Sequence, residues 1–92
     1  MARKGYTKLP SIKVYRMSRG LTQHELAAEI GISRPTLAWL ESLNSPRRPG
    51  PRLSAVIAQT VGRTRGQIID EYESIRSEQE QIRRREQIRR RR

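Results

Sequence analysis

The stretch TQHELAAEIGISRPTLAWLE, residues 22–41, decides the fold of this 92-residue chain, because it carries two helix signals around a turn signal. Thr22 and Glu25 have the spacing of a capping box, in which each side chain satisfies the other residue's backbone amide. Gly31 stands where a turn needs a left-handed residue, and Ser33 can cap the helix that follows. The segment therefore predicts two short helices joined by a tight turn.

The flanking sequence predicts three more helices and no strand. Pro10 lies in the first turn of a helix expected over residues 9–18, where a missing amide hydrogen costs nothing. Apolar spacing predicts a helix over residues 52–61 that ends at Gly62, and a second capping box at Thr64 opens another. The inner faces of these three helices are expected to carry Leu9, Ile12, Tyr15, Leu53, Val56, Ile57, Val61, Ile68, Ile69 and Tyr72. We therefore expect an all-α fold of five short helices.

Composition divides the chain into a flexible basic arm (1–8), a folded domain (9–72) and an extension (73–92) rich in Arg and Glu. The extension holds eight Arg and four Glu and contains EQIRRR twice in succession. A six-residue repeat matches no helical period, so we expect the last helix to pass residue 72 and fray into a basic tail. The net positive charge of this extension favours a non-specific DNA or RNA clamp over a dimerisation zipper.

The overall charge favours a polyanionic partner, because 20 Lys and Arg face nine Asp and Glu, a net charge of +11. No basic helix has a continuous apolar face with interfacial aromatics, so nucleic acid is favoured and no membrane is expected as a partner. No apolar run is long enough for a signal segment or a membrane span, and we expect a cytoplasmic, nucleoid-associated protein.

Catalytic chemistry is not expected. The chain has no cysteine and a single histidine, His24, so we expect no metal site and no thiol nucleophile. It also has no paired catalytic constellation and no phosphate-binding glycine loop, so we expect no enzymatic activity and no cofactor.

The stretch 22–41 closely resembles the helix-turn-helix of the lambda-repressor-like (Cro/C1, or XRE-type) proteins, and the resemblance extends over about residues 9–72. It is carried by Arg16, Gln23, Ala27, Gly31, Ile32, Leu37, Leu40, Glu41 and the pattern from Leu53 to Val61 and Gly62. Arg63 departs from the family pattern, which usually has a small apolar residue there. The resemblance implies a compact five-helix DNA-binding domain, followed here by a basic C-terminal helical extension or tail.

In this family the helix that corresponds to residues 34–42 reads bases in the major groove. The resemblance therefore implies base-reading roles for Ser33, Arg34, Pro35, Thr36, Ala38 and Trp39. Phosphate contacts are implied for Gln23, Arg47, Arg48 and Arg52, to which we add Arg3 and Lys4 of the basic arm. Arg16 and Glu41 are implied to form a semi-buried structural ion pair.

Trp39 is the only tryptophan, and helical spacing places it on the side opposite Leu37 and Leu40. We expect its indole to face DNA. The sequence leaves open a second interpretation, in which Trp39 packs under the proline-rich loop 42–52 or in a dimer contact.

The function expected from these features is that of a sequence-specific transcriptional regulator, of phage or mobile-element style, which acts by occupying a double-stranded DNA operator as a homodimer. The sequence leaves open whether it acts as a repressor or as an activator. One alternative is an antitoxin-like or other interaction module that grips a protein partner, for example RNA polymerase, through residues 73–92. Another is RNA binding through the arginine-rich tail.

Overall fold

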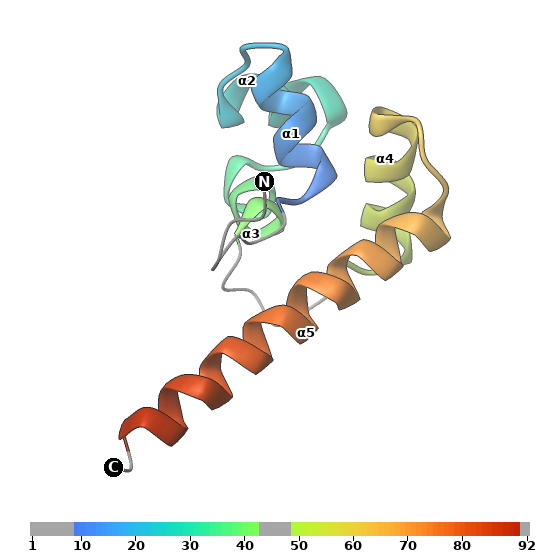
Figure 1. The fold of residues 1–92 in the computed structure, drawn as a ribbon. Coiled ribbons are helices and arrows are strands. Elements are labelled where there is room, and N and C mark those ends of the chain that lie inside the picture. Colours follow the sequence, from blue (N-terminus) through green and yellow to red (C-terminus); the bar gives the residue numbers. More distant parts are fainter. Residues whose placement is uncertain (1–8, 43–48, 91–92) are drawn as a thin grey trace.

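The computed structural model describes residues 9–42 and 49–90, with side chains of the last helix described through residue 86. The described residues form five helices and no strand, which confirms the expected all-α fold. The helices are α1 (Ser11–Ser18), α2 (Gln23–Ile30), α3 (Arg34–Glu41), α4 (Pro51–Val61) and α5 (Arg65–Arg90). The first four helices gather beside the N-terminal half of α5, and the C-terminal half of α5 extends beyond them (Figure 1).

The local helix signals are observed as the sequence predicts. Thr22 Oγ1 accepts from the backbone amide of Glu25 at 3.1 Å, and the Glu25 carboxylate accepts from the amide of Thr22 at 2.8 Å. Thr64 and Gln67 exchange the same pair of bonds before α5. Gly31 ends α2 at φ 76°, in the left-handed region that an L side chain adopts only with strain.

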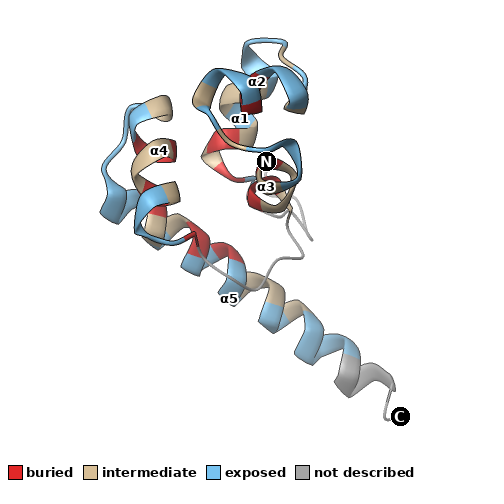
Figure 2. Ribbon diagram, turned by 180° about the vertical axis from the view of Figure 1, so that it is seen from behind, coloured by how far each residue is buried: buried red, intermediate tan, exposed pale blue. Residues whose placement is uncertain are grey.

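The core lies where the helices meet, and its buried positions turn inward from every helix (Figure 2). Its buried members are Ile12, Leu26, Ala27, Leu37, Leu40, Ile57, Ala58, Ile68 and Tyr72. The Tyr72 hydroxyl donates to the carbonyl oxygen of Leu40 at 2.6 Å. This bond satisfies a polar group that would otherwise be costly to bury, and it links α5 to the end of α3.

Two details of the predicted α1 were wrong. The helix begins at Ser11, and Pro10 is its N-cap, because the ψ of 142° at Pro10 is extended and not helical. Leu9 consequently lies outside the helix with 38% of its surface exposed, so it is not part of the inner face. Two further helix boundaries differ by one residue from those expected: α3 ends at Glu41, and α4 begins at Pro51.

A carboxylate from α5 caps α1, since Pro10 has no side chain that could do so. Glu71 accepts from the backbone amide of Ser11 at 2.9 Å and also from its hydroxyl. Arg63 donates to both Glu71 Oε1 and Ser11 Oγ at 3.1 Å. The arginine that departs from the family pattern therefore takes part in a network that joins the two helices.

As expected, α5 passes residue 72, but the expected fraying is not observed among the described residues, because α5 continues as a helix through Arg90. Ile75 is only 3% exposed, so the core reaches three residues past the proposed domain boundary at residue 72. The division of the chain at residues 8 and 72 stays a prediction.

Candidate nucleic-acid interface

The turn between α2 and α3 leaves the start of α3 on the surface. The amide of Ile32 donates to the carbonyl oxygen of Ala27 at 3.0 Å, which closes the turn after Gly31. Ser33 then caps α3 by accepting from the amide of Thr36 at 3.2 Å. Ser33, Arg34 and Pro35 are all exposed, whereas Thr36 and Ala38 are half-buried. The first turn of α3 is thus available to a partner.

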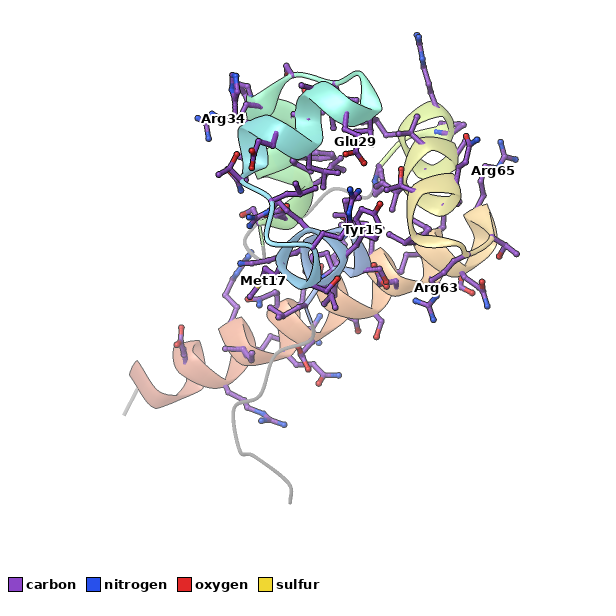
Figure 3. All side chains as sticks on the ribbon, turned by 90° about the horizontal axis from the view of Figure 1, so that it is seen from above. Tyr15, Met17, Glu29, Arg34, Arg63 and Arg65 are labelled. Atoms are coloured by element: carbon purple, nitrogen blue, oxygen red, sulfur yellow. The ribbon has the colours of Figure 1, made fainter. Side chains whose placement is uncertain are left out.

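Arg34 lies at the first position of α3 and points away from the body of the domain (Figure 3). A positive charge at a helix N-terminus opposes the helix dipole, at a cost of roughly 0.3–1 kcal/mol. The structure provides a compensating acceptor, because Arg34 Nη1 donates to Oε1 of Gln23 at 3.1 Å. A hydrogen bond therefore joins two residues with predicted DNA-binding roles that lie on different helices.

The other end of the Gln23 amide is also fixed. Its Nε2 donates to Oε1 of Glu41 at 3.0 Å. Glu41 is 3% exposed and accepts two further bonds from Arg16, at 2.7 Å from Nε and 2.9 Å from Nη2. Arg16 also donates to the carbonyl oxygen of Leu21 at 2.8 Å. The Arg16–Glu41 ion pair joins α1 to the end of α3. The hydrogen bond that Arg16 donates to Glu41 raises the pKa of the Arg16 guanidinium.

Trp39 is not turned away from the core as helical spacing predicted. Its side chain is half-buried and packs against the core cluster. Helical spacing tells only that Trp39 lies on the side of α3 opposite Leu37 and Leu40. Because other helices pack against α3 on more than one side, that side is also partly buried. Part of the side chain nevertheless remains exposed, so it is still accessible to DNA. The contact with DNA stays a prediction, and the packing of Trp39 against the core is a second role beside it.

Arg52 and residues of the helix-turn-helix line the same surface hollow, which has a volume of about 420 Å³. It lies in the first turn of α4 and is exposed. The hollow is lined by Ile30, Gly31, Ile32, Ser33, Thr36, Arg52, Leu53 and Val56. A predicted phosphate contact thus lies beside two predicted base contacts, Ser33 and Thr36. The other predicted phosphate contacts of the chain, Arg3, Lys4, Arg47 and Arg48, fall outside the described residues.

Sequence reasoning found the members of the Arg16–Glu41–Gln23–Arg34 network but not its connection through Gln23. The residues that Gln23 joins are 18 and 11 positions away in sequence. Hydrogen bonds over such separations depend on how helices pack, and no local pattern encodes them.

Two further properties bear on the kind of site. Among residues 9–42 and 49–90 there is no group of three or more His, Cys, Asp or Glu side chains that could hold a metal ion. Within the same ranges, no helix combines the length and the apolar character that are needed to cross a membrane.

A family model described as Helix-turn-helix matches residues 12–66 of the chain, from α1 into the first turn of α5. No curated protein and no solved structure matches it. The match covers more than half of the 92 residues, and the chain belongs to this helix-turn-helix family, of the Cro/C1 (XRE) type. It is therefore a DNA-binding regulator of the XRE type.

Proposed function

We propose that this protein is a sequence-specific transcriptional regulator, of phage or mobile-element style, which binds double-stranded DNA with α3 in the major groove and represses by occupying an operator. The observation that carries the proposal is the bond between Gln23 and Arg34 at the exposed start of α3. It holds a base-reading donor and a phosphate-binding amide side by side on one surface.

Arg34 is the strongest donor in this set of residues, and its guanidinium suits the O6 and N7 acceptors of guanine. Ser33 and Thr36 are lesser donors and acceptors. Pro35, Ala38 and the exposed part of Trp39 would offer apolar contact to thymine methyl groups. The proposed site thus favours a half-site that contains guanine next to thymine-rich steps.

The phosphate contacts proposed around this reading surface come from Gln23 and Arg52, with Arg3, Lys4, Arg47 and Arg48 assigned from sequence alone. Arg52 beside the Ser33–Thr36 hollow supports this arrangement. A homodimer would repeat the surface on two half-sites, as helix-turn-helix dimers do.

Selection of bound duplexes from a random library, followed by footprinting of the selected site, tests the proposal. Arg34→Ala should weaken binding to the selected site by about 1–3 kcal/mol, the usual size of a lost base contact. Arg65→Ala is the matched control, because it removes the same charge from an exposed arginine that lies far from Arg34 (Figure 3). The proposal fails if no sequence is enriched, or if both variants lose affinity equally on specific and random DNA.

A further inference from the structure

The charges of α5 are segregated along the helix. Residues 70–80 contain five carboxylates and one arginine, whereas residues 83–90 contain five arginines and one glutamate. We call residues 83–90 the arginine end of α5. The carboxylates before it repel a polyanion, so a phosphate-bearing partner of this helix is directed to the arginine end.

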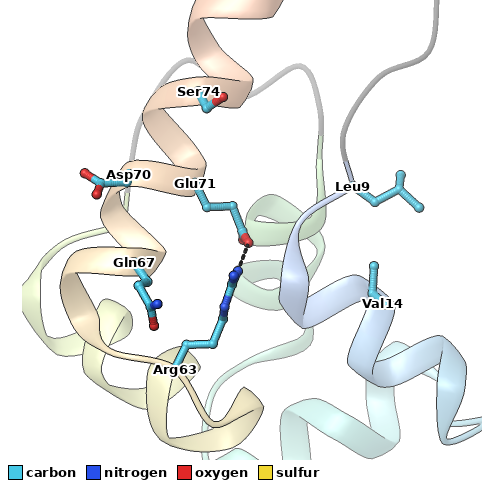
Figure 4. Close-up of a pocket in the computed structure, with 7 residues that line it drawn as sticks. All are labelled: Leu9, Val14, Arg63, Gln67, Asp70, Glu71 and Ser74. Atoms are coloured by element: carbon cyan, nitrogen blue, oxygen red, sulfur yellow. Dashed lines mark hydrogen bonds and ion pairs between the residues drawn. The ribbon is translucent and has the colours of Figure 1, made fainter. Parts of the chain in front are cut away.

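The half of α5 before the arginine end is fixed to the domain. Glu71 points from α5 toward the start of α1, where it accepts from the backbone amide of Ser11 at 2.9 Å (Figure 4). The Tyr72 hydroxyl donates to the carbonyl oxygen of Leu40 at 2.6 Å. None of the described side chains at positions 76–86 is buried. The domain therefore sets the direction of α5, and the arginine end projects from it (Figures 1 and 2).

The described arginines of this end are available to an external anion. Arg83, Arg84 and Arg85 are exposed, and none of them forms an ion pair with another described residue. A helix C-terminus favours cations, but this effect is confined to the last turn, and the three arginines precede the last turn of α5.

The arginine positions surround the helix and do not form one stripe. Successive residues of a helix are about 100° apart, so residues 83–85 span about 200° of its circumference. Residues 89 and 90 are also arginines, and helical spacing places both positions outside that arc. A flat anionic surface can contact only some of these positions at once. The arrangement fits an anion that encloses the helix.

Two kinds of polyanion fit this arrangement poorly. An anionic membrane takes up a helix by an apolar face, and residues 76–90 contain only Ile82 and Ile88 as apolar residues. The major groove of B-DNA is about 12 Å wide and about 8.5 Å deep, so a helix of about 10–12 Å diameter lies in it with its outer side away from the phosphates. One side of the arginine end would then lack a partner.

The arginine end also lies away from the proposed DNA-reading surface. Figure 3 shows Arg34 and α5 on opposite sides of the domain. The hydrogen bond between α5 and α3 is made at Leu40, near the C-terminal end of α3, whereas Arg34 is the first residue of that helix. A duplex at the start of α3 therefore leaves the arginine end accessible to a second polyanion.

From these observations we propose that the arginine end of α5 binds structured RNA at a site separate from the DNA-reading surface. A folded RNA with unpaired nucleotides can enclose a helix, because its backbone departs from the regular duplex. Arginine suits this partner better than lysine does, since its guanidinium pairs with phosphate in a bidentate manner and stacks on unpaired bases. The inference narrows the DNA or RNA clamp expected from composition to RNA, and it does not depend on operator binding.

Binding of the full chain to three probes tests the proposal. The probes are an RNA hairpin with a purine bulge, the DNA hairpin of the same sequence, and vesicles of phosphatidylserine and phosphatidylcholine. The RNA hairpin should bind at least about tenfold more tightly than the DNA hairpin at the same salt concentration. RNA hairpin added to a complex of the protein with duplex DNA should give a ternary complex in a gel-shift experiment.

The triple variant Arg83→Gln/Arg84→Gln/Arg85→Gln should lower affinity for the RNA hairpin by at least about tenfold and flatten the slope of log K against log salt by about 2 units. Its melting temperature should be unchanged, because the three side chains are exposed. The variant Arg83→Lys/Arg84→Lys/Arg85→Lys keeps the charges and should still bind RNA several-fold more weakly than the unaltered protein.

Arg19→Gln/Arg65→Gln/Arg76→Gln is the matched control, because it removes the same number of charges from exposed arginines outside the arginine end. It should leave affinity for the RNA hairpin within about twofold, since salt screens charges that do not contact the RNA.

The proposal is overturned if this control loses as much RNA affinity as the glutamine variant at residues 83–85, or if the lysine variant binds RNA as tightly as the unaltered protein. Equal binding of the RNA and DNA hairpins would instead identify the arginine end as a DNA clamp, and binding to vesicles alone would identify it as a membrane anchor. Displacement of duplex DNA by the RNA hairpin would place the RNA on the α3 surface and also overturn the proposal.

Discussion

Glu41 determines which end of the Gln23 amide faces Arg34. The Glu41 carboxylate only accepts hydrogen bonds, so it takes the Nε2 group of Gln23, at 3.0 Å. The carbonyl oxygen of Gln23 is then left for Arg34, whose Nη1 lies 3.1 Å from it. A buried residue at the end of α3 thereby orients an exposed residue at its start.

Gln23→Ala should remove the acceptor that holds Arg34 and weaken operator binding by about 1 kcal/mol, the usual worth of one hydrogen bond. Random duplex should lose less, because the freed arginine can still reach phosphates. Equilibrium binding to the two DNAs measures the difference. The neighbouring exposed residue provides the control, His24→Ala. Equal losses on operator and random DNA would show that Gln23 contacts phosphate without positioning Arg34.

Glu41→Gln should destabilise the domain by about 2–4 kcal/mol, because it leaves the Arg16 guanidinium without its charged partner in a largely buried position. Urea unfolding monitored by circular dichroism measures this loss. The double variant Arg16→Met/Glu41→Leu removes both charges. Its loss of stability should be smaller than the sum of the losses in the single variants Arg16→Met and Glu41→Leu. Additive losses would mean that the ion pair is not coupled in the folded state.

Trp39→Ala should lower the melting temperature by several degrees, since a half-buried indole that packs on the core contributes about 1–2 kcal/mol. Operator affinity, measured where both proteins are folded, should fall by a further ~1–3 kcal/mol if the exposed part of the indole reads a base. An unchanged affinity would confine Trp39 to packing, and an unchanged melting temperature would contradict its place at the core.

Binding should depend steeply on salt, with a slope of log K against log salt of about −4 to −5 per protomer for roughly 4–6 phosphates. Arg47→Ala/Arg48→Ala should flatten this slope by about 2 units and weaken all sequences alike, and Arg52→Ala should flatten it by about 1. Titrations at several salt concentrations measure each slope, with Arg65→Ala as the control. A slope that the double variant leaves unchanged would remove residues 47 and 48 from the phosphate contacts.

Tyr72→Phe should cost about 1–2 kcal/mol at neutral pH, because the Leu40 carbonyl loses its donor. Burial raises the pKa of the Tyr72 phenol, with smaller contributions from Glu71 and Glu41. The unfolded chain therefore loses this proton first, above a pH of about 10, and stability falls by up to about 1.4 kcal/mol per pH unit beyond it. The free energy of unfolding of the unaltered protein and of the Tyr72→Phe variant, measured from pH 8 to 11, isolates the contribution of the Tyr72 phenol. Parallel curves for the two proteins would contradict it.

The sequence by itself determined the helices, the turn and the family. The Thr22–Glu25 and Thr64–Gln67 boxes, the left-handed Gly31 and the Ser33 cap each depend on residues within one turn of each other. Short-range hydrogen bonds and apolar spacing are legible in the order of residues, because neighbours along the chain remain neighbours in space. The set of site residues followed from the same stretch through its resemblance to the family.

Only the tertiary structure decided how those pieces act on one another. Glu71 caps α1 from 60 residues away, and Gln23 bridges Glu41 and Arg34. Trp39 is half-buried although its own helix suggests an exposed face. Each outcome is set by which helices pack together and at what distance, which depends on the burial of the whole core and not on any local pattern. The sequence identified the residues of the candidate site, and the packing of the helices determined which of them are in contact.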